Sequence, residues 1–310
     1  MSRYIIITPV RNEADHIGRT IESMVAQTER PSFWVIVNDG STDATGAIID
    51  EAAKQHPWIR TLHRADRGFR KSGGGVIEAF KDGLRLLSSL KSSPGQIEAA
   101  PVQPSTVPWD FLVKLDGDLF FEPDYFAQCL GRFEKDAKLG IGGGVVCDDV
   151  NGKWLEEVKG DPPFHVRGAT KIYRRACWEA IGGLLSAPGW DTLDEVKANM
   201  LGWRTYTFRD IRLLQLKSTG TADGTWKNWV KNGRANYITG YHPLFMIAKC
   251  ASRLRDKPYG VISAALFYGF FSSYFRSVAR VDDPKLINYL RDQQLRRLTW
   301  RPSLWSPNGK

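Results

Sequence analysis

The first 115 residues alternate short apolar segments with segments of helical spacing, and this alternation limits the fold more than any other feature. Apolar runs suited to buried strands occupy residues 4–8, 33–37, 59–62 and 111–115. Between these runs, apolar side chains recur at helical spacing in residues 17–25, 47–52 and 76–87. Apolar strands separated by helices are typical of a parallel sheet that is covered on both faces. We therefore predict an α/β fold built on a mostly parallel central sheet.

The composition narrows the functional class only in part. With 310 residues and ordinary globular proportions of apolar and charged side chains, the chain is neither disordered nor collagen-like. Its net charge of +9 favours an anionic partner: a nucleotide, a nucleic acid or an acidic membrane face. The four cysteines lack the spacing of a zinc knuckle or a redox pair, so we expect buried thiols in a reducing compartment. The residues after Met1 lack the long apolar segment of a signal peptide, which favours a cytoplasmic catalytic part.

Acidic residues follow two of the predicted strands, at the edge where such sheets bind ligands. Asp39 comes directly after the second strand, and Asp116-Gly117-Asp118 follows the fourth. In open parallel sheets, ligands bind outside the carboxyl ends of the strands. Residues two apart in an extended segment point to the same side, so Asp116 and Asp118 offer paired oxygen ligands to Mg²⁺ or Mn²⁺. A solvated turn is the alternative for an isolated Asp-x-Asp triplet, but its position after an apolar strand favours a metal site.

Three segments taken together resemble the family 2 glycosyltransferases of the GT-A fold. They are residues 8–13 (Thr-Pro-Val-Arg-Asn-Glu), residues 38–43 (Asn-Asp-Gly-Ser-Thr-Asp) and residues 116–118 (Asp-Gly-Asp). Their order and spacing are close to the family pattern P-x-x-N-E, D-D-G-S-x-D-x-T and D-x-D. The resemblance covers roughly the first two thirds of the chain. The chain departs from the pattern at Asn38, where the family often has aspartate, and in residues 67–71, which are unusually rich in cations.

The resemblance implies a donor site for a nucleotide-diphosphate sugar, with a UDP-sugar as the expected donor. The residues expected to line this site are Thr8, Pro9, Arg11, Glu13, Asp39, Arg67, Lys71, Asp116 and Gly117. Within it, Asp118 is the expected main ligand of Mg²⁺ or Mn²⁺, and Asp116 is the second. Lys71, assisted by Arg67, is expected to face the diphosphate, because cations there offset phosphate charge.

The catalytic base is expected in residues 189–195, which resemble the family segment that carries it. Counting back from Gly202, which resembles the glycine that ends a helix in the family, places Asp191 at the base position. Asp194 and Glu195 are rival candidates. The alternative is that these carboxylates only stabilise the start of a helix, where acidic side chains are favoured. With Asp191 as general base, the resemblance implies inversion by single displacement, with sugar transfer to an acceptor hydroxyl.

The second half of the chain is more irregular, and from Tyr237 onward it is expected to be helical. The processive Gln-x-x-Arg-Trp motif of the family is replaced by residues 226–234, which disfavours processive synthesis. Arg234 is expected either to reach the diphosphate or acceptor or to be a plain surface cation. We divide the chain into a catalytic domain (1–220), with a surface insertion at 91–108, and a helical, partly apolar region (221–310).

Residues 259–275 contain no charged side chain and are flanked by arginines and lysines. As a helix this segment spans about 25 Å, which is short of the ~30 Å of a bilayer core. It is expected either to lie in the headgroup zone of a membrane or to be buried against the catalytic domain. Membrane contact at the inner face of the cell membrane suits a lipid-linked acceptor, and polysaccharide or glycolipid assembly; a carbohydrate acceptor suits either arrangement.

Rival functions explain fewer of these features. A nucleotidyltransferase normally has a Gly-rich, Arg-containing loop after its first strand, where this chain has Pro9 to Glu13. A non-catalytic membrane scaffold accounts for the charge and the apolar C-terminal part, but not for acidic motifs at strand ends. No known nucleic-acid motif appears, and the tryptophans and cations are dispersed. The sequence therefore favours an enzyme that takes a nucleotide-sugar donor.

Overall fold

The structure is a computed structural model that describes residues 3–68, 74–89, 107–157, 161–217 and 224–306. Its strands are β1 (Tyr4–Val10), β2 (Phe33–Asp39), β3 (Ile59–Arg64), β4 (Phe111–Leu115), β5 (Leu119–Phe121), β6 (Leu139–Val150), β7 (Lys153–Glu156), β8 (Thr170–Arg174) and β9 (Arg204–Gln215). Its helices are α1 (Ile17–Val25), α2 (Thr45–Gln55), α3 (Gly74–Ser89), α4 (Tyr125–Lys135), α5 (Arg175–Ile181), α6 (Trp190–Met200), α7 (Thr225–Ile238), α8 (Pro243–Ser252), α9 (Val261–Phe275) and α10 (Pro284–Leu298). The strands and helices predicted for the first 115 residues are all present.

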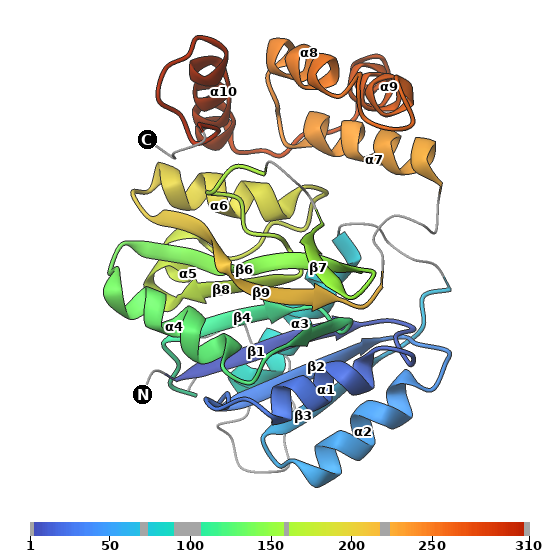
Figure 1. The fold of residues 1–310 in the computed structure, drawn as a ribbon, viewed down its shortest axis with the longest axis vertical. Coiled ribbons are helices and arrows are strands. Elements are labelled where there is room, and N and C mark those ends of the chain that lie inside the picture. Colours follow the sequence, from blue (N-terminus) through green and yellow to red (C-terminus); the bar gives the residue numbers. More distant parts are fainter. Residues whose placement is uncertain (1–2, 69–73, 90–106, 158–160, 218–223, 307–310) are drawn as a thin grey trace.

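One sheet runs through the molecule in the order β3-β2-β1-β4-β8-β6-β9-β5, with β7 paired to β6. The strands β1 to β4 pair in parallel. β8 then pairs antiparallel with both β4 and β6, and β6 and β9 are parallel to each other. Helices cover both faces of this sheet (Figure 1). The predicted α/β architecture with a mostly parallel sheet is therefore confirmed.

Alternate residues of the central strands point into two separate apolar cores. On one face, Ile6 and Ile36 pack with residues of α1, α2 and α4. On the other face, Ile7 and Val35 pack with residues of α3, α5 and α6. This alternation follows from the period of two along a strand. Helices cover both faces of the sheet, so polar side chains can cluster at the carboxyl ends of the strands, where they remain solvated.

A third core joins α6 to the helices that follow β9. Leu193 and Val196 on the outer side of α6 pack with apolar side chains of α7, α8, α9 and α10. Figure 1 shows these four helices gathered at one end of the molecule, beyond α6. Helices α7 and α9 cross closely enough that a β-carbon on Gly233 would lie 2.3 Å from the carbonyl oxygen of Leu266. Glycine is therefore needed at this crossing.

The apolar segment 259–275 contains helix α9, which has both buried and exposed apolar side chains. Helix α9 buries Leu266 and Phe270 in the third core, while Phe267 and Phe275 remain 47% and 90% exposed. Among the described residues, no helix has the length and apolar character needed to cross a bilayer. The four cysteines are buried and free, as predicted. The predicted insertion at 91–108 falls almost entirely outside the described residues.

Candidate active site

Asp39 lies at the carboxyl end of β2, where two arginines hold its side chain. Arg64 donates to Oδ1 at 2.5 Å, and Arg67 donates to Oδ2. The main-chain carbonyl of Asp39 accepts a hydrogen bond from Arg11 at 2.6 Å. Arg67 also pairs with Glu78 on α3, 3.2 Å away. This network fixes the Asp39 carboxylate at the rim of the sheet, and it leaves Arg67 engaged with carboxylates.

The other residues expected from the first strand divide into buried and accessible groups. Thr8 is fully buried, and its hydroxyl accepts a hydrogen bond from Trp34 Nε1 at 2.8 Å. Pro9, within β1, is half-buried. Arg11 pairs with Asp66 at 2.6 Å. The side chains that face the strand-end rim are thus those of Arg11 and Glu13, whereas Thr8 stabilises the sheet. Lys71 lies outside the described residues.

Asp116, Gly117 and Asp118 follow β4 and differ in how each is held. Asp116 is partly exposed and accepts a hydrogen bond from the ammonium of Lys114. Gly117 packs so tightly that a β-carbon there would lie 2.5 Å from Val10 Cγ1. The buried side chain of Asp118 accepts a hydrogen bond from Gln215 Nε2 at 3.3 Å. The packing against Val10 explains why a small residue separates the two carboxylates.

Negative charge accumulates around Asp118. Burial and the charge of Asp116, with a further contribution from Glu13, raise the pKa of Asp118 to about 7. Glu13 pairs with Lys217 after β9 at 3.0 Å, and its buried Oε2 atom has no hydrogen-bond partner among the described residues. Carboxylates that raise one another's pKa values in this way suit a bound cation, which removes the repulsion.

A Mg²⁺ or Mn²⁺ ion at the end of β4 would need oxygen ligands besides the protein carboxylates. Among the described residues, no three His, Cys, Asp or Glu side chains come together as a ready set of metal ligands. Such ions commonly keep several waters and use one or two carboxylates together with substrate phosphates. Asp116 and Asp118 match that pattern, since both supply hard oxygen donors and Asp116 is accessible.

Asp191 lies in the first turn of α6 and is connected to Asp116 through Lys114. The Lys114 ammonium donates to the carbonyl of Gly168 at 2.5 Å and lies 5.6 Å from the ring centre of Trp190. A β-carbon on Gly168 would in turn lie 3.6 Å from Cβ of Asp191. The strand-end carboxylates and the first turn of α6 are thus parts of one continuous set of contacts.

The three acidic residues of α6 have different surroundings. Asp194 is buried and accepts hydrogen bonds from Lys171 at 2.9 Å and from the Tyr173 hydroxyl at 2.6 Å. Glu195 is buried and pairs with Lys171 at 2.7 Å and His165 at 2.9 Å. These contacts occupy the carboxylates of both rivals in a closed ion-pair network.

Asp191 differs because it is partly exposed and its carboxylate is not tied into that ion-pair network within the described residues. Burial raises its pKa, but the positive charges of His165, Lys171 and Arg167 outweigh burial and hold the pKa of Asp191 below its ordinary value. The carboxylate is therefore ionised at neutral pH and able to accept a proton.

Lys114 and Lys171 are site residues that the sequence analysis did not single out. Both are almost fully buried on strands, at 2% and 0% exposure. Each was detectable as a lysine inside an apolar strand pattern, Phe-Leu-Val-Lys-Leu and Thr-Lys-Ile-Tyr. A buried lysine requires a paired carboxylate, and that requirement is the signal that points to Asp116 and Asp194.

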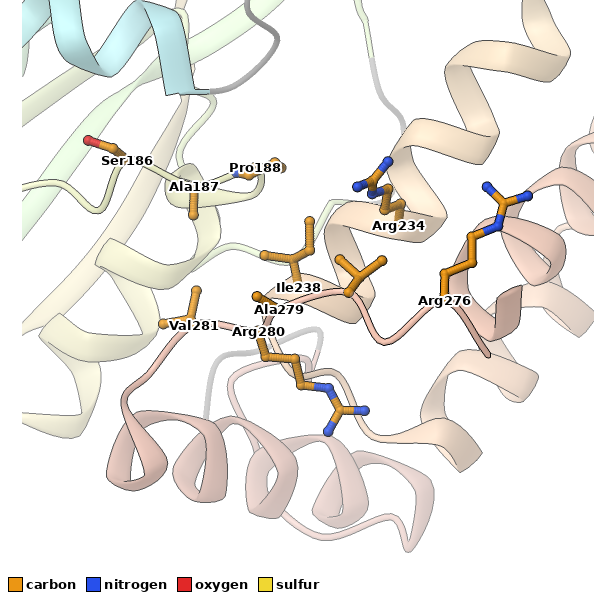
Figure 2. Close-up of a pocket in the computed structure, with 10 residues that line it drawn as sticks. Ser186, Ala187, Pro188, Arg234, Ile238, Arg276, Ala279, Arg280 and Val281 are labelled. Atoms are coloured by element: carbon orange, nitrogen blue, oxygen red, sulfur yellow. The ribbon is translucent and has the colours of Figure 1, made fainter. Parts of the chain in front are cut away.

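Arg234, the cation predicted to reach the diphosphate or acceptor, is exposed on α7. It lines a cavity of about 530 Å³ together with residues 186–188, Ile238, Arg276 and residues 278–281 (Figure 2). Residues 186–188 directly precede α6. The helical region is therefore adjacent to the chain segment that carries Asp191.

Part of the chain resembles a known protein family. Residues 5–80 match the model of the family described as Glycosyl transferase family 2. Chondroitin synthase of Escherichia coli is 28% identical over 134 residues, which cover 43% of this chain and 16% of that protein. The chain therefore spans only a small part of this curated relative.

Two solved structures share the fold. The mannosyltransferase PcManGT of Pyrobaculum calidifontis, in complex with GDP-Man and Mn²⁺, has a TM-score of 0.54 and 17% identity, covering 97% of this chain and 84% of that chain. Residues 1–349 of S. aureus TarS, in complex with UDP-GlcNAc, have a TM-score of 0.50 and 16% identity, covering 93% and 79%. The chain shares the GT-A fold of these glycosyltransferases. Within the chain, residues 5–80 resemble glycosyltransferase family 2.

Proposed function

We propose that this chain transfers a sugar from a nucleotide-diphosphate donor to an acceptor hydroxyl, with inversion and with the help of Mg²⁺ or Mn²⁺. The observation that carries the proposal is the continuous set of contacts from the Asp116 carboxylate, through Lys114 and Gly168, to Asp191 on α6. A donor held at the strand ends thereby has its reacting carbon near a carboxylate that is free to accept a proton.

Donor binding is assigned to the rim formed by the ends of β1, β2 and β4. Asp39, held by Arg64 and Arg67, offers carboxylate oxygens to the base or ribose of the nucleotide. Asp118 and Asp116 would hold the divalent cation, whose positive charge would offset the negative charge of the departing diphosphate. A UDP-sugar is the donor to test first, since the fold neighbour TarS was solved with UDP-GlcNAc; GDP-mannose, found with PcManGT, is the second. A thermal-shift screen of both with Mn²⁺ identifies the donor.

Proton removal from the acceptor is assigned to Asp191. Its neighbours Asp194 and Glu195 are committed to Lys171, so they hold α6 in place. Lys171 also donates to the main-chain carbonyl of Asp191, which fixes the first turn of the helix. In this arrangement Asp191 receives the hydroxyl proton as the acceptor oxygen attacks the anomeric carbon, and no covalent intermediate is formed.

Asp191→Asn is expected to lower the transfer rate at least about a hundredfold while nucleotide affinity stays unchanged, because the amide cannot accept the proton. Transfer is measured as radiolabelled sugar incorporated, and nucleotide affinity by calorimetric titration. Asp161→Asn serves as a matched control in a loop outside α6 and should retain the wild-type rate. A normal transfer rate in Asp191→Asn, with loss only in a folded Asp194→Asn or Glu195→Gln variant, would reassign the base.

Residues 1–220 form the catalytic domain in this proposal, and residues 221–310 form the helical region that receives the acceptor. A carbohydrate or a lipid-linked carbohydrate is the proposed acceptor, and polysaccharide or glycolipid assembly is the proposed setting. The exposed apolar face of α8 and α9 supports contact with an acidic membrane surface. We assign to that face the exposed apolar side chains of α8, of α9 and of the segment between them: Leu244, Ile247, Leu254, Tyr259, Phe267, Tyr268 and Phe275. Arg255 and Lys257 are exposed beside it, which suits anionic headgroups.

The double variant Phe267→Ser/Phe275→Ser is expected to bind vesicles at least about tenfold more weakly, since burying each phenylalanine contributes roughly 1.5–3 kcal/mol. Binding is measured by sedimentation with vesicles of 70% phosphatidylcholine and 30% phosphatidylglycerol. Trp300→Ser is the matched control, because Trp300 is 88% exposed but follows α10 instead of lying on this face. Equal partitioning of the double variant and the wild type would exclude membrane contact through α9.

A further inference from the structure

The cavity beside α7 combines an apolar wall with two exposed arginines. Ile238, Val278 and Val281 supply apolar lining, and Arg234 and Arg276 supply positive charge. Within the described part of the chain, no carboxylate forms an ion pair with either arginine. Arg276 donates one side-chain hydrogen bond there, to the Tyr268 hydroxyl at 3.2 Å. Most of the hydrogen-bonding capacity of the two guanidinium groups is therefore available to a ligand.

Arg280 has a different part in the same cavity. Its guanidinium carbon lies 4.3 Å from the ring centre of Tyr237 and 4.8 Å from that of Tyr274. Figure 2 shows its side chain extending away from those of Arg234 and Arg276. The two tyrosines belong to α7 and α9, so this stacking anchors the segment that follows α9. The cavity therefore has a fixed wall, even though that wall is formed by a loop.

The position of the cavity relates it to the proposed base. Residues 186–188 line it and end three positions before Asp191, so Pro188 and Asp191 lie at most ~11 Å apart along the chain. Ser186 is held by Lys81 of α3 at 2.9 Å. Gly189 packs on α7, since a β-carbon there would lie 2.5 Å from Thr239 Cγ2. A ligand that contacts Pro188 in the cavity is therefore close enough for a small molecule to extend from it to the first turn of α6.

We propose that this cavity binds a phosphate group of the acceptor, together with the apolar chain attached to that phosphate. Arginine pairs of this kind bind phosphate oxygens through forked hydrogen bonds. The apolar wall suits a hydrocarbon segment and would be left unused by a bare sugar. This inference rests on the proposed function, because it names the class of acceptor for the transfer reaction. Binding of a ligand in the cavity can be tested without that reaction.

The binding test uses octyl phosphate as the probe, below its critical micelle concentration, with no nucleotide or metal present. Calorimetric titration of the wild type is expected to show binding that is tighter than binding of methyl phosphate and absent with octyl glucoside. Arg234→Gln/Arg276→Gln is expected to weaken octyl phosphate binding at least tenfold. Arg301→Gln is the matched control, because Arg301 is exposed and lies outside the cavity. Equal affinity in the double variant and the wild type would overturn the site, as would equal binding of octyl glucoside.

Two further experiments are needed. One identifies the molecule that supplies the phosphate, and the other shows whether the binding site or the proposed transfer reaction has failed. Vesicles containing phosphatidylglycerol that compete with octyl phosphate would assign the cavity to membrane headgroups and overturn its role in acceptor binding. Asp118→Ala should keep full octyl phosphate affinity. If no donor supports transfer while the arginine-dependent binding persists, the transfer proposal fails and the site stands. If transfer proceeds but octyl phosphate does not bind, only the site is wrong.

Discussion

Asp118→Ala is expected to lower sugar transfer about a hundredfold to a thousandfold, because lost stabilisation of developing charge costs roughly 3–4 kcal/mol at such sites. Asp118 is 8% exposed and shares its surroundings with Asp116 and Glu13, whose charges raise its pKa. Removing it leaves one accessible carboxylate for the cation, and the diphosphate then departs without adequate neutralisation. The fold should persist, because alanine at this position removes only a 3.3 Å hydrogen bond from Gln215 within the described part of the chain.

Two measurements check this expectation. Transfer is assayed with Mn²⁺ at saturating concentration, after EDTA treatment, and after Mn²⁺ is added back. Mn²⁺ affinity in the presence of the nucleoside diphosphate is measured by electron paramagnetic resonance, which does not depend on turnover. Glu122→Ala is the control, since Glu122 is an exposed acidic residue just past β5. Wild-type activity in excess EDTA, or unchanged Mn²⁺ affinity in Asp118→Ala, would contradict the metal role.

The central sheet was predictable because local pattern and tertiary structure agree there. The strands β1, β2 and β4 are apolar runs that remain almost wholly buried, and α1 and α3 each show a clear apolar face. Parallel pairing then brings the strand ends to one edge without any further information. The positions of Asp39 and Asp116 followed from that rule, and not from any feature of the carboxylates themselves.

The strands of the second half of the sheet were harder to predict from the sequence. β8 pairs antiparallel with β4 along its full length, from Phe111 opposite Arg174 to Leu115 opposite Thr170. These partners are far apart in the sequence, so no local pattern specifies their register. Strand β6 carries Gly142, Gly143 and Gly144, which lie against neighbouring backbone and aromatic rings. Long-range packing decides such segments.

Helix α9 shows why the sequence could not decide between a membrane environment and a buried environment for this segment. A run without charges carries no periodic contrast between a buried and an exposed face, so burial cannot be assigned to particular residues. The structure makes the assignment through Gly233 and Gly269, whose missing side chains let α7 and α9 approach at backbone distance. That contact selects Leu266 and Phe270 for the interior and leaves Phe267 and Phe275 outside.

Lys171→Met is expected to lower the free energy of unfolding by about 3–5 kcal/mol, because removing one member of a buried ion pair leaves its partner uncompensated. Lys171 is fully buried and lies 2.9 Å from Asp194 and 2.7 Å from Glu195. Burial lowers the pKa of Lys171, but these two carboxylates raise it above its ordinary value. Methionine fills a similar volume, so the loss reports mainly on charge. Urea unfolding followed by tryptophan fluorescence measures it.

A double variant separates the ion pair from simple packing. In Lys171→Met/Asp194→Asn one of the two uncompensated charges is also removed, so the double variant should lose less stability than the sum of the two single changes. Lys54→Met is the control, because Lys54 pairs with Glu51 at the surface and its side chain is 75% exposed. Strict additivity in the double variant would mean that Lys171 contributes through its alkyl chain alone. The same outcome would remove the reason for Asp194 to be a support of α6, and it would return Asp194 to the candidates for the base.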